Sequence, residues 1–123
     1  MEVRSRDDAN AFTTLDGSTI RVLLDAALGG AAKQSLAEAS LEPGLATQRH
    51  YHAQSEEIYV FLDGGGEMEV EGDSRQVGPG DAVLVPAGAW HQITAGHDGA
   101  RFLCCCAPPY SDADTFFTEI VSE

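Results

Sequence analysis

The sequence predicts an all-β fold in a single domain that spans residues 1–123. Short turn-forming sequences rich in Gly, Pro and Asp recur along the whole chain, and the segments between them have the length of strands. Helical periodicity stays weak until the C-terminal tail. A chain of this length has room for one modest hydrophobic core, so we expect one small sandwich or barrel.

Each predicted strand is a segment of strand length between two such turns. A short C-terminal helix is predicted over Asp114–Val121, because Ser111 or Asp112 can cap its first turn. In chain order, the predicted strands are Ser18–Asp25, Gln34–Ala39, Gln48–Tyr51, Glu57–Leu62, Gly66–Glu71, Ser74–Val77, Ala82–Val85, Gln92–Ala95 and Ala100–Ala107.

The composition is strongly acidic, with 20 Asp and Glu against 7 Lys and Arg and a formal net charge of -13. Such a surface repels phosphate backbones and anionic lipids, so we expect no binding to nucleic acids or membranes. No apolar run approaches the roughly 20 residues that a membrane span needs. The N-terminal residues carry charges without an apolar stretch behind them, so no signal peptide is expected and a cytoplasmic location is predicted.

Three cysteines follow one another, at Cys104, Cys105 and Cys106. Neighbouring residues cannot form a relaxed disulfide, and the triplet lacks the C-x-x-C spacing of a metal site. Strand alternation places Cys104 and Cys106 on one face and Cys105 on the other. We expect small apolar side chains of a buried strand in a reducing compartment, with a thiol available to line a pocket.

The histidines of the central segment have the spacing of a metal site. His50 and His52 are two residues apart, so they point to the same face of a strand. Glu57 can join that face from the far side of a tight loop, and His91 can arrive from a later hairpin after a Pro-x-Gly turn. Three imidazoles and one carboxylate that converge inside a barrel would bind a divalent transition metal and leave coordination positions open.

Strand alternation also predicts which other side chains face the barrel interior. Tyr59 and Phe61 share the face of Glu57, and Met68 points away from a stripe of glutamates that must face water. These three side chains, with the face of the cysteine strand that carries Cys104 and Cys106, are predicted to line a pocket above the metal. Gln48 is expected near the mouth. Tyr59 is the predicted catalytic or substrate contact, because a buried phenol needs a hydrogen-bond partner; simple packing is the alternative.

Two rows of apolar side chains exceed what so small a monomer can cover, and they predict a homodimer with an isologous interface. They are Ile58, Val60 and Leu62 in one strand and Ile20, Val22 and Leu24 in the N-terminal strand.

Two sequence motifs resemble those of the cupin family. The first is Gly44-Leu-Ala-Thr-Gln-Arg-His50-Tyr-His52-Ala-Gln-Ser-Glu-Glu57-Ile-Tyr-Val-Phe-Leu-Asp-Gly64, in which the step to Gly64 selects Glu57 over Glu56. The second is Gly80-Asp-Ala-Val-Leu-Val-Pro86-Ala-Gly88-Ala-Trp-His91. The sequence departs from the family pattern at Ala95, where cupins have an Asn, and this departure leaves the four ligands intact.

The resemblance implies the double-stranded β-helix of cupins, an RmlC-like jelly-roll barrel. It also implies one divalent transition metal per chain (Fe, Mn, Ni, Zn, Co or Cu) on His50, His52, Glu57 and His91. Cupins include isomerases, lyases, dioxygenases and plain sugar-binding modules. We therefore expect a metal-dependent enzyme that acts on a small polar metabolite, with a non-catalytic sugar- or acid-binding module or an accessory protein for a larger enzyme as alternatives.

Overall fold

The structure is a computed structural model that describes residues 1–117, and its regular elements are almost all strands. The strands are β1 (Phe12–Thr13), β2 (Thr19–Leu24), β3 (Ser35–Leu41), β4 (Tyr51–His52), β5 (Glu56–Val70), β6 (Asp73–Val77), β7 (Ala82–Val85), β8 (His91–Ala107) and β9 (Thr115–Phe116), with 3-10 turns at Arg6–Asp8 and Asp112–Asp114.

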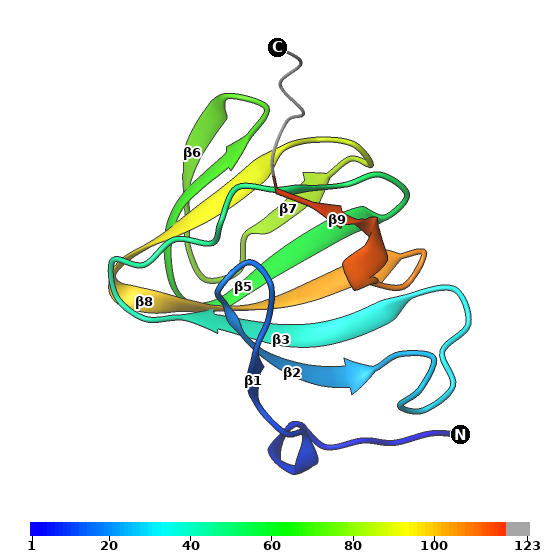
Figure 1. The fold of residues 1–123 in the computed structure, drawn as a ribbon. Coiled ribbons are helices and arrows are strands. Elements are labelled where there is room, and N and C mark those ends of the chain that lie inside the picture. Colours follow the sequence, from blue (N-terminus) through cyan, green and yellow to red (C-terminus); the bar gives the residue numbers. More distant parts are fainter. Residues whose placement is uncertain (118–123) are drawn as a thin grey trace.

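The strands form an antiparallel barrel. The main sheet has the order β1-β2-β3-β8-β5-β6, with β7 added to β5, and β4 pairs with β9 in a second, small sheet. The long strands β5 and β8 pair with each other and curve through both halves of the barrel (Figure 1). This topology confirms the predicted all-β barrel.

The bend in β5 and β8 occurs at glycines. The pairing register shifts between Gly64 and Gly66, where the backbones of the two strands approach closely. A Cβ atom on Gly64 would overlap the carbonyl oxygen of Gly99, and one on Gly66 would overlap that of Thr94. Only glycine therefore permits this crossing.

The predicted strands differ from the observed ones mainly at these glycines. Glu57–Leu62 and Gly66–Glu71 are parts of the single strand β5, and Gln92–Ala95 and Ala100–Ala107 are parts of β8. The two glycine-rich segments resemble hairpin turns, but they face each other across the β5–β8 pair and bend the strands without reversing them. Most of Gln48–Tyr51 is irregular, and only its last residue belongs to β4.

The predicted C-terminal helix is wrong for the residues that the structure describes. Ser111 does accept a hydrogen bond from the Ala113 amide, but the turn that it caps is a short 3-10 turn. The chain then continues as β9, because Thr115 and Phe116 are good strand formers that pair with His52 and Tyr51 of β4. The remainder of Asp114–Val121 beyond residue 117 lies outside the described residues.

The hydrophobic core fills the end of the barrel at which β5 and β8 bend, with core residues on both sides of the bend. Phe61, Ile93 and Phe102 are at most 1% exposed, and Val85 and Met68 pack with them. Within residues 1–117, no helix has the length and apolar character needed to cross a membrane. The barrel core leaves the opposite end of the interior for polar side chains.

Candidate metal centre

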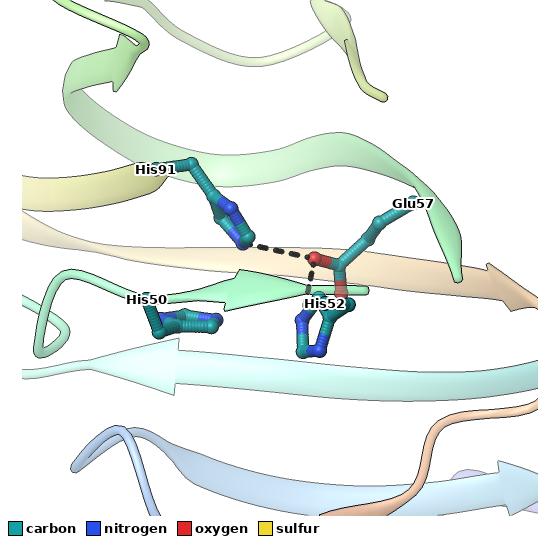
Figure 2. Close-up of side chains that lie close together, drawn as sticks. All are labelled: His50, His52, Glu57 and His91. Carbon is teal, nitrogen blue, oxygen red and sulfur yellow. Dashed lines mark ion pairs between the residues drawn. The ribbon is translucent and has the colours of Figure 1, made fainter. Parts of the chain in front are cut away.

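The four side chains singled out by their spacing come together at that polar end. His50 lies just before β4, His52 is in β4, Glu57 is in β5 and His91 begins β8. His50 and His91 are held side by side, because each backbone amide donates to the other's carbonyl oxygen, at 3.1 and 2.8 Å. One ligand atom from each of the four residues lies within 4.8 Å of the others, and all four side chains are buried (Figure 2).

Backbone carbonyl groups fix the orientation of two of the rings. His50 Nδ1 lies 2.7 Å from the Gln48 carbonyl oxygen, and His91 Nδ1 lies 3.0 Å from that of Ala89. A carbonyl can only accept, so each Nδ1 must carry the hydrogen. The Nε2 lone pairs of His50 and His91 are therefore free to bind a cation.

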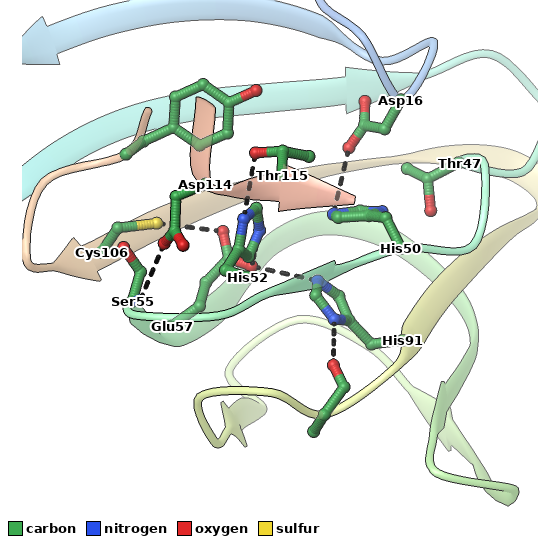
Figure 3. A network of polar contacts seen from close by, with 12 residues as sticks. Asp16, Thr47, His50, His52, Ser55, Glu57, His91, Cys106, Asp114 and Thr115 are labelled. Atoms are coloured by element: carbon green, nitrogen blue, oxygen red, sulfur yellow. Dashed lines mark hydrogen bonds and ion pairs between the residues drawn. The ribbon is translucent and has the colours of Figure 1, made fainter. Parts of the chain in front are cut away.

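The C-terminal segment orients the third ring (Figure 3). Thr115 Oγ1 lies 3.2 Å from His52 Nδ1 and donates its own hydrogen to the Ser111 carbonyl oxygen. It therefore accepts from His52 Nδ1, which leaves His52 Nε2 as the third free donor of an electron pair. The neighbouring Asp114 carboxylate holds the loop between His52 and Glu57. It accepts hydrogen bonds from the backbone amides of Gln54, at 3.0 Å, and Ser55, at 3.1 Å.

The donor atoms meet the requirements of a bound metal. Glu57 Oε1 lies 3.2 Å from His91 Nε2 and 3.5 Å from His52 Nε2. Within the described residues, Glu57 Oε1 and His91 Nε2 are buried atoms without a hydrogen-bond partner. Two electron-rich atoms left facing each other in a protein interior are costly unless a cation lies between them. Three imidazole nitrogens and one carboxylate fit a divalent transition metal.

The protonation states also favour metal binding. Burial and the neighbouring His91 lower the pKa of His50 to about 4, so this ring is neutral at neutral pH. Burial raises the pKa of Glu57, but its contacts with His52 and His91 outweigh burial and hold that pKa far below its usual value. A neutral imidazole and an ionised carboxylate are the forms that bind metals.

The cysteine strand contributes a contact to Glu57. Cys106 is buried, and its thiol donates to Glu57 Oε2 at 3.3 Å, which leaves Oε1 to face the histidines. Burial raises the pKa of Cys106 far above its usual value, so the group stays a thiol. Cys105 points the opposite way and contacts Gln34 at 3.6 Å, as strand alternation requires.

A small cavity of about 90 Å³ extends from His50, His52 and Glu57 between β2, β3 and β8. Tyr59, Cys104 and Cys106 are among the residues that line it. Most of the remaining wall is apolar, and the exposed rings of Phe12 and Tyr110 stand at the outer part of the lining.

Three side chains expected at this pocket lie elsewhere. Phe61 and Met68 are packed in the core and do not line the cavity, which corrects the expected lining. The Gln48 side chain is exposed, and the contacts of this residue with the site are made by its backbone, through His50 and Asp16. Gln48 precedes the short strand β4, so the strand parity assumed for it does not apply.

Asp16 is a site residue that sequence reasoning missed. Its Oδ2 lies 3.9 Å from His50 Nε2, and its side chain lines the cavity. Its Oδ1 accepts both the amide of Ser18, at 2.9 Å, and the Ser18 hydroxyl, at 2.6 Å. The Asp16 carbonyl accepts the amide of Gln48, which ties this turn to the histidine segment. In the sequence, Asp16 was recognisable only as part of a turn.

Comparison with known proteins agrees with this geometry. Residues 37–106 match the cupin domain family. Over 114 residues the chain is 40% identical to an uncharacterized protein of Methanocaldococcus jannaschii, covering 92% of this chain and 91% of that one.

Solved structures show the same fold. The polyketide cyclase RemF from Streptomyces resistomycificus has a TM-score of 0.82 and 26% identity, over 98% of this chain and 87% of that chain. The Streptomyces nucleoside dehydratase Pac13 has a TM-score of 0.79 and 16% identity, over 99% of this chain and 94% of that chain. These similarities confirm the expected jelly-roll barrel.

Proposed function

The chain belongs to the cupin family, and on that premise we propose that it is a metal-dependent enzyme acting on a small molecule inside the barrel. The observation that carries the proposal is the pair of buried, unpartnered acceptors, Glu57 Oε1 and His91 Nε2, of which Glu57 lines an open cavity. One divalent transition metal per chain, held by these two residues with His50 and His52, would satisfy both atoms.

Two side chains of the cavity can assist a reaction, Asp16 as a proton acceptor and Tyr59 as a hydrogen-bond donor. When bound, the metal would supply Lewis-acid polarisation of a substrate oxygen. Asp16 has one oxygen fixed by Ser18, and the other, near His50 Nε2, can accept a proton from a ligand. Burial raises the pKa of Tyr59 well above its usual value, so its hydroxyl stays protonated and can donate a hydrogen bond to a ligand.

This combination favours lyase or isomerase chemistry over oxygenation. Both of the former reactions need a base and a group that donates a hydrogen bond to a polarised oxygen, and Asp16 and Tyr59 could fill these roles. The solved neighbours named as a polyketide cyclase and a nucleoside dehydratase support an enzyme of this kind. We also propose a cytoplasmic location, consistent with the three free thiols.

We further propose a homodimer that covers the outer face of β5 and β7. Ile58 is 41% exposed, and Leu84, its partner across the two strands, is 56% exposed. Val60 continues this row and is only partly buried. The second predicted row is less suited to the interface, because Ile20 and Val22 line the internal cavity. Light scattering tests the dimer: a 13.0 kDa particle at micromolar concentration would contradict it.

The enzyme proposal is tested by loading purified protein with zinc, manganese or iron and then measuring metal content and turnover. Enolisable hydroxy compounds are incubated in deuterated water, and proton exchange and product formation are followed by NMR. We expect about one metal per chain. Tyr59→Phe and Asp16→Asn are expected to reduce turnover at unchanged metal content. Ligand-dependent melting shifts without turnover would instead identify a binding module, and oxygen uptake with iron alone would identify an oxygenase.

A further inference from the structure

We infer that the cavity selects an uncharged or cationic ligand, with an apolar body and at least one hydrogen-bond donor, and that it rejects carboxylates and phosphates. The inference rests on the proposed metal centre as the anchor of the ligand and names the class of molecule that the centre accepts. Three properties of the cavity lead to it: the sign of its charges, the acceptor beside the histidines, and the apolar walls.

Among the described residues, the cavity lining contains carboxylates but no basic side chain other than histidine. Its remaining ionisable side chains are tyrosines and cysteines. Asp16, Asp25 and Glu57 are carboxylates, and none of the described residues that line the cavity is Lys or Arg. Only one of these carboxylates, Glu57, belongs to the metal-binding set. An anionic ligand would therefore face Asp16 in a partly dry cavity without a basic side chain to compensate.

The arginines near the barrel have partners outside the cavity. Arg49 binds Glu69 at 2.6 Å, and Arg101 binds Glu38 at 3.3 Å. Arg21 donates to the Ala9 carbonyl oxygen at 2.7 Å. The net charge of -13 adds repulsion of anions before they reach the mouth. These arginines therefore form ion pairs and hydrogen bonds within the protein instead of facing a ligand in the cavity.

Asp16 gives the cavity an acceptor in a fixed position. Both hydrogen bonds from Ser18 go to Oδ1, so the carboxylate cannot rotate freely. Its other oxygen, Oδ2, lies 3.9 Å from His50 Nε2, which places it directly beside the metal-binding atoms. A ligand with a hydroxyl or amine hydrogen satisfies this oxygen, whereas a carboxylate offers only further acceptors.

The walls beyond the polar end suit an apolar body. Ile20 and Val22 of β2 and Phe102 of β8 line the cavity. Phe12 and Tyr110 also line it and are 48% and 39% exposed, so their rings are available to contact a ligand that projects through the mouth. Aromatic rings of this kind contact flat or apolar groups favourably.

The test compares two ligands with the same skeleton on the cobalt-loaded protein: 2-hydroxybenzyl alcohol, which is neutral, and 2-hydroxybenzoate, which is an anion. Binding is followed by calorimetry and by the visible absorption of cobalt. In free solution the anion is the better chelator. We nevertheless expect the alcohol to bind the wild-type protein about tenfold more tightly, because like charges oppose the anion. Asp16→Asn should remove this preference, since it removes the charge and keeps an acceptor for Ser18.

Asp98→Asn is the matched control, because Asp98 is an exposed carboxylate that does not line the cavity. It makes the same charge change and should leave the preference for the alcohol intact. Cobalt content, measured before each titration, separates the two proposals. Protein that takes up no cobalt would refute the proposed metal centre. Cobalt-loaded wild-type protein that binds 2-hydroxybenzoate as tightly as the alcohol would refute the selectivity and leave the metal centre standing.

Discussion

The two ends of the barrel interior differ in construction, although β5 and β8 run through both. At one end, Glu57 and His91 keep buried polar atoms without partners within the described residues, and Glu57 lines a cavity. At the other end, Phe61 and Ile93 are 1% and 0% exposed and pack into a continuous apolar core. The packed end supplies most of the burial that stabilises the fold, and the polar end has unpartnered acceptors that a bound cation would satisfy.

This difference shows that strand alternation determines the face of a side chain and leaves its depth in the barrel undetermined. Glu57, Tyr59 and Phe61 all point inward from β5. At about 3.3 Å per residue, however, Phe61 lies roughly 13 Å along the strand from Glu57. Tyr59 between them contacts both regions, because it lines the cavity and stacks on Phe102 at 5.0 Å. A pocket residue is therefore defined by its position along the strand as well as by its face.

The largest expected effect is the loss of metal on replacing His91 by Ala. The free energy of binding at such sites, about 10–16 kcal/mol for structural zinc, is shared among four ligands. Removing one of them should therefore weaken binding about a hundredfold to a thousandfold. Competition with a chelating dye measures the change. Replacing the exposed His97, which lies outside the cluster, is the control and should have no effect.

The matched change at the packed end is Ile93→Ala, two residues along the same strand. Ile93 is fully buried in the core, so its truncation should lower the free energy of unfolding by about 2–5 kcal/mol. Metal content at low temperature should stay near that of the wild type. Urea unfolding and elemental analysis measure the two properties. Ile93→Val, expected to cost about 0.5–1.5 kcal/mol, provides a folded variant should the alanine variant unfold. Metal loss in Ile93→Val would show that the two ends are not independent.

Local patterns in the sequence predicted much of the barrel and the set of four converging side chains. The i, i+2 spacing of His50 and His52 and the Pro-x-Gly turn before His91 are short-range features, so they could be recognised without tertiary information. The turns around most strands were recognisable for the same reason. The bend at Gly64–Gly66 could not be recognised, because a run of glycines in the sequence is equally typical of a hairpin turn and of a bent strand.

Contacts between distant segments could not be predicted. Asp16 approaches His50 only because β1 and β2 close over the cavity, and Thr115 reaches His52 only because β9 pairs with β4. Neither residue lies in a motif. The tail also carried a helix-capping Ser111, a local signal that the pairing of β9 with β4 overrides.

The contact of Thr115 with His52 predicts an intermediate effect at the polar end. Thr115→Val removes the hydroxyl that accepts from His52 Nδ1, so the ring loses the bond that fixes its orientation and tautomer. Metal affinity should fall about 10–100-fold, a range typical for residues that orient ligands. Thr115→Ser keeps the hydroxyl and should restore most of the affinity. Equal losses in both variants would show that packing of β9, and not the hydrogen bond, is what matters.

The smallest expected effects are two pH dependences of opposite sign. The stability of the metal-free protein should fall as the pH rises, whereas the affinity for metal should rise. Burial lowers the pKa of His52, but its contact with Glu57 outweighs burial, so this pKa is raised. A pKa that rises on folding adds stability that is present below the unfolded value and disappears as the pH rises through the folded value. The metal-free protein should therefore lose this contribution on going from acidic to neutral pH.

Metal binding should respond in the other direction, because the ion must displace the proton of His52. Below the pKa of His52, affinity should fall about tenfold per pH unit, and above that pKa it should level off. His50, with its pKa lowered to about 4, releases no proton in this range. Calorimetry in buffers of different ionisation enthalpy counts the protons released, and we expect about one on the acidic side and none on the plateau. If Glu57→Gln leaves the midpoint of the affinity curve unchanged, the proton does not belong to His52, because its raised pKa depends on the Glu57 carboxylate.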